Sequence, residues 1–241
     1  MQRFLVAANL LAGESVTLEG AAARQISLVL RMAPGEHITL IDGQDSEAEC
    51  VLVVVAQRQV TVRVLNRTRS IAEPTLRIHL FPALLRATRF ELALQKATEL
   101  GVAAITPVLA QRSVARPAGD VVPERWKSIV REAVEQSGRG RLPALQAPIA
   151  FESACAEARQ ADLALCCSAH GGVELRTLFA QGIPRTLAVI IGPEGGLTPT
   201  ELIEAAQAGL QAVTLGPRIL RAETATMAIC AAALCLAGDW R

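Results

Sequence analysis

The spacing of hydrophobic positions changes near residue 71, and this change divides the chain. Before it, "HITLIDGQDSEAECVLVVV" and "QVTVRVLNRT" are rich in β-branched residues, with the turn pair Asp42–Gly43 in the first run and the short link Gln57–Gln59 between the two. This pattern is typical of β-hairpins. The stretch "GAAARQISLVLRM" has room for one short helix before an apolar run at Ile26–Leu30. Residues 1–71 are therefore predicted to form a small barrel-like β domain.

From residue 72 onward, strand and helix patterns alternate. A strand over Leu76–Leu84 precedes "RATRFELALQKATELG", where apolar residues recur at helical spacing up to Gly101. Further strands are expected in "VAAITPVLA", "DLALCCS", "TLAVIIG" and "AVTLG", and further helices in "VPERWKSIVREAVEQSG", "VELRTLFAQG", "TPTELIEAAQAG" and the apolar run 224–236. Strands that alternate with helices form a parallel sheet covered on both faces. Residues 72–241 are thus predicted to be an α/β domain, with its ligand beyond the carboxyl ends of the strands.

One of these strand ends carries the glycine turn "VIIGPEGGLTPTEL". Its glycines lack the spacing of a dinucleotide fingerprint, and Leu197 and Thr198 stand where a phosphate-binding P-loop needs Lys and Ser or Thr. Glu194 in the middle of the turn would repel a phosphate. Thr198, Pro199 and Glu201 predict a capping box, which satisfies the first helix amides internally. The ligand is therefore expected to bind without a phosphate.

A second glycine-bearing strand end is "VTLGPRILRAETA". The strand Ala212–Leu215 runs into Gly216–Pro217, and a helix is expected to open near Glu223–Thr224. Ile219 and Leu220 have two interpretations: they plug the core, or together with Leu215 they sandwich a flat purine. Arg221 and Glu223 are either a surface ion pair or polar groups of a site.

Composition narrows the class of protein. The 241 residues are 51% hydrophobic and 20% charged, as in ordinary globular domains, and the longest uncharged apolar run, Ala225–Ala237, is too short for the roughly 20 residues that span a bilayer. No extended apolar leader follows the first residues. We expect a cytoplasmic protein that is not embedded in a membrane.

Six cysteines are present without a CxxC pair. His170 lies three residues after Cys167, but the adjacent cysteines Cys166 and Cys167 are poorly placed to face one zinc ion together. The cysteines are expected to be small buried residues in a reducing compartment, and no metal is expected.

The net charge is only +1, but its distribution is uneven. Lysine and arginine outnumber aspartate and glutamate by 11 to 7 in residues 71–150, whereas the acids lead by 9 to 6 in residues 151–241. A basic middle third favours an anionic polymer as partner, although solvated surface charge gives a similar pattern. The candidate contacts for such a polymer are Arg3, Arg86, Arg89, Arg112, Arg116, Arg139 and Arg141. With no Tyr and 3% aromatic residues, stacking platforms for bases are scarce.

Taken together, "IGPEGGLTPTEL" and "LGPRILRAETA" resemble the SPOUT methyltransferases, and within them the RsmE family. The blocks "MQRFLV", "RFELALQKATELGVAAITPV", "QRS" and "RWKSIVREAVEQSGR" extend the resemblance over nearly the whole chain. One position departs from it, because the family usually has a histidine where this chain has Gln25.

The resemblance implies a specific architecture and activity. Residues 1–71 would be a PUA-like β-barrel that binds RNA, and residues 72–241 a SPOUT α/β domain whose C-terminal segment is threaded into a deep trefoil knot, in a homodimer. The activity would be S-adenosylmethionine-dependent methylation of N3 of a uridine in the 16S ribosomal RNA of the small subunit. The implied cofactor pocket contains Ile191, Gly192, Pro193, Gly195, Gly196, Leu215, Gly216, Ile219, Leu220, Thr224 and Ala225.

The chemistry of uracil suggests roles for the polar residues of the two loops. N3 must lose its proton before or during attack, so a base is required. Glu223 or Glu194 is the candidate base, and Arg221 is the candidate cation that stabilises the uracil anion at a carbonyl oxygen. Two other functions stay open: another SPOUT activity, on a ribose 2′-hydroxyl or a different base, and a non-catalytic RNA-binding or ribosome-assembly protein.

Overall fold

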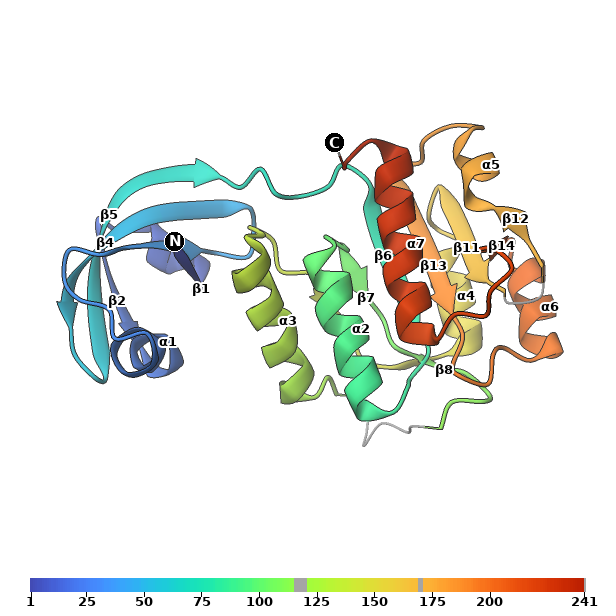
Figure 1. Cartoon of the computed structure of the whole chain (residues 1–241), viewed down its shortest axis with the longest axis horizontal. Helices are drawn as coiled ribbons and strands as arrows, with labels where there is room; N and C mark the ends of the chain where they lie inside the picture. Colours follow the sequence, from blue (N-terminus) through green and yellow to red (C-terminus); the bar gives the residue numbers. More distant parts are fainter. Residues whose placement is uncertain (115–120, 169–170, 241) are drawn as a thin grey trace. The chain divides into compact units, whose positions relative to one another are not determined.

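The computed structural model describes residues 1–114, 121–168 and 171–240 (Figure 1). Arg116 and His170, named above, lie outside the described residues. The contacts group the chain into two compact units, Met1–Glu73 with Arg131–Leu142, and Pro74–Val130 with Pro143–Arg241. Each unit is described by itself.

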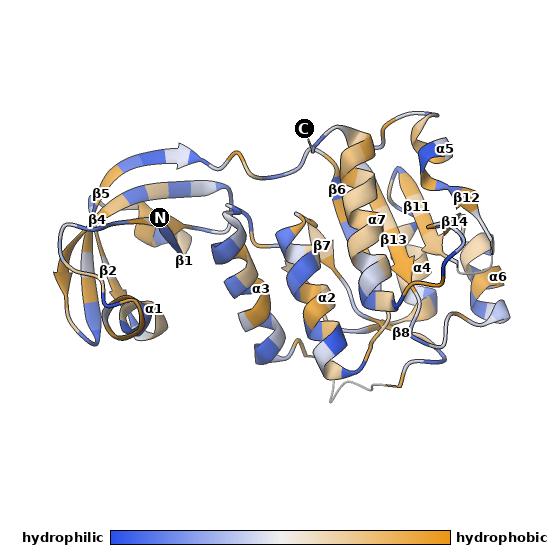
Figure 2. Cartoon of the chain, viewed as in Figure 1, coloured by the Kyte–Doolittle hydropathy of each residue, from blue (hydrophilic) through white to orange (hydrophobic). Residues whose placement is uncertain are grey.

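The first unit is built on a mixed sheet that forms half of a barrel. Its strand order is β1-β3-β4-β5-β2, with β1 parallel to β3 and the other pairs antiparallel. Side chains alternate in polarity along the first half of β5 (Figure 2) and in burial along most of β4, because one face covers a core that includes Phe4, Ile38 and Val62. The strands are β1 (Gln2–Leu5), β2 (Ser15–Glu19), β3 (His37–Ile41), β4 (Ser46–Val55) and β5 (Gln59–Arg69).

Helical turns occupy more of this unit than the pattern indicated. Gly20–Arg24 forms α1 and Gln25–Val29 continues it as one π-helical turn, while Ala8–Ala12 is a short 3-10 helix. The short helix for which this stretch had room is present, and the helical turn continues into the apolar run that follows it. In that run, Ile26–Leu30, only Ile26 is fully buried, and Val29 is 74% exposed, so the run lacks the alternation of a half-buried strand.

The segment Arg131–Leu142 packs on this first unit through charges. Arg139 donates from Nε and Nη2 to the two carboxylate oxygens of Glu73 at 3.1 and 2.7 Å, and the Arg141 amide donates to the same carboxylate at 3.1 Å. The Leu142 amide donates to the Gly43 carbonyl at 3.0 Å. Local sequence patterns carry no trace of such long-range pairs, and the expected boundary at residue 71 placed this segment in the second domain. That boundary stays a prediction.

The second unit contains a seven-stranded, fully parallel sheet in the order β12-β14-β11-β13-β6-β7-β9. A parallel pair, β8 and β10, adds a small second sheet. The strands are β6 (Arg77–Pro82), β7 (Ala104–Ile105), β8 (Val108–Leu109), β9 (Ala144–Leu145), β10 (Ile149–Ala150), β11 (Leu163–Cys167), β12 (Val173–Glu174), β13 (Thr186–Ile191) and β14 (Gln211–Thr214). The α/β class and the parallel sheet are confirmed.

Helices cover both faces of this sheet (Figure 1). The central strands are buried on both sides, so β13 is hydrophobic along its length (Figure 2). Leu187, Val189 and Ile191 of β13 join one core, and Ala188 and Ile190 join the other. The helices of the first core are α2 (Ala87–Glu99), the start of α3 (Glu124–Ser137), α5 (Leu175–Phe179) and α7 (Ala222–Ala237), and those of the second are α4 (Phe151–Ala158) and α6 (Pro199–Gln207).

Two local expectations were incomplete. The run "VAAITPVLA" forms two short strands, β7 and β8, in different sheets rather than one. Helix α4 was not expected, although its buried residues Phe151, Ala154, Cys155 and Ala158 have helical spacing. Among the described residues, no helix combines the length and the apolar character needed to cross a membrane.

A histidine in β6 makes the stability of the second unit depend on pH. His79 Nε2 lies 2.8 Å from Thr106 Oγ1, and burial lowers the pKa of His79 to about 4. In the unfolded chain, a histidine takes up its proton near pH 6.5. Between those values the unfolded state binds more protons, so the free energy of unfolding must fall as the pH is lowered from about 6.5 to about 4.

We predict that His79→Gln removes this part of the pH dependence. Glutamine keeps a polar group near Thr106 but does not titrate. The loss of unfolding free energy between about pH 7 and pH 4.5 should be smaller in the variant by roughly 1–2 kcal/mol, as measured by urea denaturation at each pH. All other titrating groups are common to both proteins. Equal losses would show that His79 is not the responsible group.

Candidate active site

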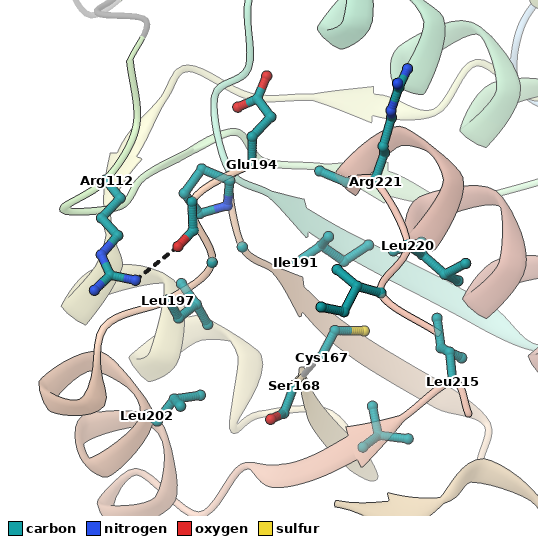
Figure 3. A pocket seen from close by; sticks show the side chains of 18 of the residues that line it. Arg112, Cys167, Ser168, Ile191, Glu194, Leu197, Leu202, Leu215, Leu220 and Arg221 are labelled. Atoms are coloured by element: carbon teal, nitrogen blue, oxygen red, sulfur yellow. Dashed lines mark hydrogen bonds between the residues drawn. The ribbon is translucent and has the colours of Figure 1, made fainter. Parts of the chain in front are cut away.

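Two loops meet at one edge of the parallel sheet and enclose a cavity. They follow β13 and β14, which flank β11 in the sheet, so all three strands end at the same edge. The cavity has a volume of about 710 Å³, within the range of small-molecule sites. Its walls come from the glycine turn 192–197, the connector 215–221 and the start of α7 (Figure 3).

The glycine turn is shaped by close backbone packing. A Cβ atom on Gly192 would lie 2.9 Å from Leu197 Cγ and 3.1 Å from the Leu197 amide nitrogen, so no larger residue fits without a shift. Gly196 has φ of +69°, which favours glycine, and its amide donates to the Pro193 carbonyl at 2.8 Å. The predicted capping box is confirmed: the Glu201 amide donates to Thr198 Oγ1 at 3.2 Å, and the Thr198 amide donates to Glu201 Oε2 at 2.7 Å.

The connector 215–221 presents both apolar and polar groups to the cavity. Leu215 and Leu220 are half-buried: both line the cavity, and both also pack on the core. Ile219 lines the cavity but is 78% exposed, which makes it a rim residue rather than a core plug. Arg221 is the N-cap residue of α7, and its carbonyl accepts from the Ala225 amide at 2.8 Å.

The structure brings together most of the residues predicted for the pocket. Thr224 is the exception among the eleven, because its side chain is exposed and does not line the cavity. The ten that line it are Ile191, Gly192, Pro193, Gly195, Gly196, Leu215, Gly216, Ile219, Leu220 and Ala225.

Sequence reasoning missed the contribution of β11. Cys167 and Ser168 line the cavity at the carboxyl end of this strand. The signal was present, since "DLALCCS" was recognised as a strand and ligands lie beyond strand ends. Burial raises the pKa of Cys167 to about 12, with a smaller contribution from nearby Cys230. The thiol is therefore protonated at neutral pH and forms an uncharged part of the cavity wall. Leu197, Leu202 and Val213 add further apolar surface.

Arg89, at the start of α2, links carboxylates from both loops. Its Nη1 donates to Glu194 Oε1 at 3.2 Å, and its Nε lies 3.9 Å from Glu223 Oε1. Glu223 is only 7% exposed, and its Oε2 has no hydrogen-bond partner among the described residues. The alternative of a surface pair between Arg221 and Glu223 is therefore wrong, because the ion pair of Glu223 is with Arg89 and the carboxylate is buried.

Three predicted catalytic residues take different positions around the cavity. Glu194 and Arg221 both line it, and their side chains point to the same side in Figure 3. Glu223 does not line it, but its Oε1 forms an ion pair with Arg89, which does. A carboxylate and a guanidinium that face one cavity are suited to accept a proton and to stabilise a developing negative charge.

The arginines predicted to contact RNA divide into free and committed groups. Arg139 is a correction: its side chain is 2% exposed and bound to Glu73, so it has no surface to offer a phosphate. Arg141 pairs with Asp45, and Arg3 with Glu47 at 2.6 Å, both partly exposed. Arg86 is exposed. Arg89 and Arg112 line the cavity, and Arg112 Nη1 donates to the Gly195 carbonyl at 2.8 Å (Figure 3).

Comparisons with known proteins agree with this geometry. The family model for an RNA methyltransferase domain matches residues 72–234. Ribosomal RNA small subunit methyltransferase E from Synechocystis is 33% identical over 226 residues, which cover 92% of this chain and 74% of the relative. The protein of that name from Bacillus subtilis is 30% identical, over 88% of this chain and 86% of the relative.

Solved structures are similar over almost the full length. Ribosomal RNA small subunit methyltransferase E from Neisseria gonorrhoeae, bound to S-adenosylmethionine, has a TM-score of 0.92 and 36% identity, with 100% of both chains covered. A putative methyltransferase from Legionella pneumophila, in complex with the same cofactor, has a TM-score of 0.85 and 30% identity over 97% of this chain and 96% of that one.

Proposed function

This chain belongs to the ribosomal RNA small subunit methyltransferase E family, and on that premise we propose that it methylates N3 of a uridine in 16S ribosomal RNA with S-adenosylmethionine as donor. Membership supports the general reaction, an S-adenosylmethionine-dependent methylation of ribosomal RNA. The resemblance of "IGPEGGLTPTEL" and "LGPRILRAETA" to RsmE motifs supports the choice of N3 of uridine.

The observation that carries the proposal is the cavity between the two glycine loops. The glycine turn forms one wall of this cavity, where Gly192, Gly195 and Gly196 carry no side chains that would fill the space. Leu197, Leu215 and Leu220 provide the apolar surface that a flat adenine needs. These residues fit the adenosyl part of S-adenosylmethionine, which when bound supplies an electrophilic methyl group on a sulfonium cation.

Activation of uracil requires a base and a cation, and different residues around the cavity take these two roles. Geometry favours one of the two candidate bases, since a base must reach the proton that it removes. Glu194 lines the cavity and Glu223 does not, so Glu194 accepts the N3 proton and Glu223 holds Arg89 in place. Arg221 donates to a uracil carbonyl as negative charge develops, which its fixed guanidinium can do without titrating.

The finer features of the fold belong to the same proposal. We propose that residues 1–71 are a PUA-like barrel that binds RNA and that the C-terminal segment is knotted. The strand order supports the knot: the chain passes from β13 over β11 to β14, and α7 then packs back on α2. The proposal also places the chain in the cytoplasm and gives it the small ribosomal subunit as partner, without a metal.

Binding and product analysis test the function together. Calorimetry should show binding of S-adenosylmethionine at micromolar to millimolar concentration. If the protein binds none of it in that range, only an RNA-binding or ribosome-assembly role is left. In a deletion strain, N3-methyluridine should be missing from 16S RNA and return when the purified protein is added to small subunits. Nucleoside mass spectrometry would refute the named reaction if N3-methyluridine persists, and a missing 2′-O-methyl or other base mark would indicate another SPOUT activity.

Replacing the two polar residues that face the cavity should slow transfer without loss of the cofactor. We predict that Arg221→Lys lowers kcat by about 10²-fold, because the ammonium keeps the charge but loses the planar pair of donors. Glu194→Gln should lower kcat by about 10²–10³-fold, because the amide cannot accept the proton. Single-turnover methylation and calorimetry measure the two effects.

Glu204→Gln is the matched control, since Glu204 is exposed on α6 and lies outside the cavity. Its turnover should equal that of the wild type. An unchanged kcat for Arg221→Lys would show that Arg221 takes no part in catalysis, and an unchanged kcat for Glu194→Gln would show that another group is the base.

We also predict a homodimer formed through α7. Apolar residues dominate this helix, and Met227, Ala228 and Ala231 stay half-exposed on one side while the opposite side is buried in the core. A second copy covering that side would bury apolar surface that a lone chain leaves in water. Light scattering should give twice the chain mass of 25.5 kDa. A monomer at micromolar concentration would contradict this part of the proposal.

A further inference from the structure

The turn Gln111–Arg112, which follows β8, contacts the glycine turn at one point and the N-terminal cap of α6, which directly follows that turn, at a second. At the first, Arg112 Nη1 donates to the Gly195 carbonyl at 2.8 Å. The stem of the same side chain packs on the glycine, because a Cβ atom on Gly195 would lie 3.4 Å from both Cβ and Cδ of Arg112. Arg112 therefore contacts Gly195 along its length, through the stem and through the guanidinium.

The second point runs through the carboxylate of Glu201. This side chain is only 5% exposed. Its Oε1 accepts from the Gln111 amide at 2.7 Å, and its Oε2 accepts from the Thr198 amide at 2.7 Å. A single buried carboxylate thus connects Gln111 to the end of the glycine turn. Because the acceptor is charged, each bond is stronger than one between neutral groups.

These two contacts restrain a turn whose glycines cannot restrain it themselves. Gly192, Gly195 and Gly196 have no side chains with which to fix their own conformation, and glycine loses more freedom on ordering than any other residue. A loop that is ordered before its ligand arrives binds more tightly, since the ordering cost is already met within the fold.

We infer that the Gln111–Arg112 turn holds the glycine turn in its ligand-binding shape, with Arg112 as a positioning residue for the cofactor rather than a contact for RNA phosphate. The inference rests on the proposed function, because it names the cofactor as the ligand of that turn. It also replaces the RNA role that the charge distribution indicated for Arg112. A guanidinium that is already bonded to the Gly195 carbonyl stabilises the glycine turn and has one donor fewer for a phosphate.

Arg112→Met isolates the hydrogen bond, because methionine keeps an apolar stem beside Gly195 but has no donor. The dissociation constant of S-adenosylhomocysteine, measured by calorimetry, should rise on the order of 10-fold, as expected for the loss of one charged hydrogen bond. Arg112→Lys retains a donor and should recover most of the affinity. KM for S-adenosylmethionine should rise with kcat changed far less, which a general loss of folding would not produce.

Binding of 16S RNA transcripts at several salt concentrations tests the competing role. A phosphate contact would reduce the slope of log affinity against log salt by about 1 in Arg112→Met, whereas a positioning residue leaves the slope unchanged. Arg159→Met is the matched control, because Arg159 is exposed at the end of α4 and lies outside the cavity. It should alter neither cofactor affinity nor turnover.

Three results separate the possibilities. An unchanged affinity for S-adenosylhomocysteine in Arg112→Met, or a reduced salt slope, overturns the positioning role. If Arg112→Met fails to fold by thermal denaturation, Arg112→Gln takes its place, because its shorter amide falls short of Gly195, and the same weakening is required. If the wild-type protein itself binds no S-adenosylhomocysteine, the proposed function fails, whereas binding by the wild type and by Arg112→Met alike refutes only the inference.

Discussion

The parallel alignment of β13, β11 and β14 is the constraint on which the site depends. Parallel neighbours in one sheet end at the same edge, so the loops after β13 and β14 are brought together although about twenty residues separate their motifs. The alignment is secured by burial on both faces, with Val189 in one core and Ile190 in the other. A slip of one residue would exchange the two cores and separate the loops.

Arg89 connects the same two parts of the chain by ion pairs. Glu194 belongs to the first loop and Glu223 to the helix after the second, and the guanidinium of Arg89 lies between their carboxylates at 3.2 and 3.9 Å. Two carboxylates near one cavity repel each other, and a cation shared between them offsets the repulsion. Removing it would leave Glu223 as a buried charge without a partner, which is far more costly than the loss of an exposed ion pair.

The sequence predicted most of the fold and of the pocket, and most of its failures have a common physical cause. The alternation of strand and helix patterns predicted the parallel sheet, and the resemblance of the two strand-end motifs to the RsmE family implied ten of the residues that line the cavity. Most of what it missed depends on distant partners. Arg139 looked like a surface cation because Glu73 lies 66 positions away. Cys167 is the exception, because the carboxyl end of its predicted strand was a local signal for the cavity.

The arginines show why charge counts alone do not assign function. The basic middle third of the sequence contains Arg89, Arg112 and Arg139 with the same side chain, yet each has a different acceptor: two carboxylates, a backbone carbonyl and the carboxylate of Glu73. A guanidinium whose donors are already bonded gains less from a phosphate, because binding must first break those bonds. Under the proposed function, contacts with RNA are therefore expected from exposed arginines such as Arg86 rather than from the buried Arg139.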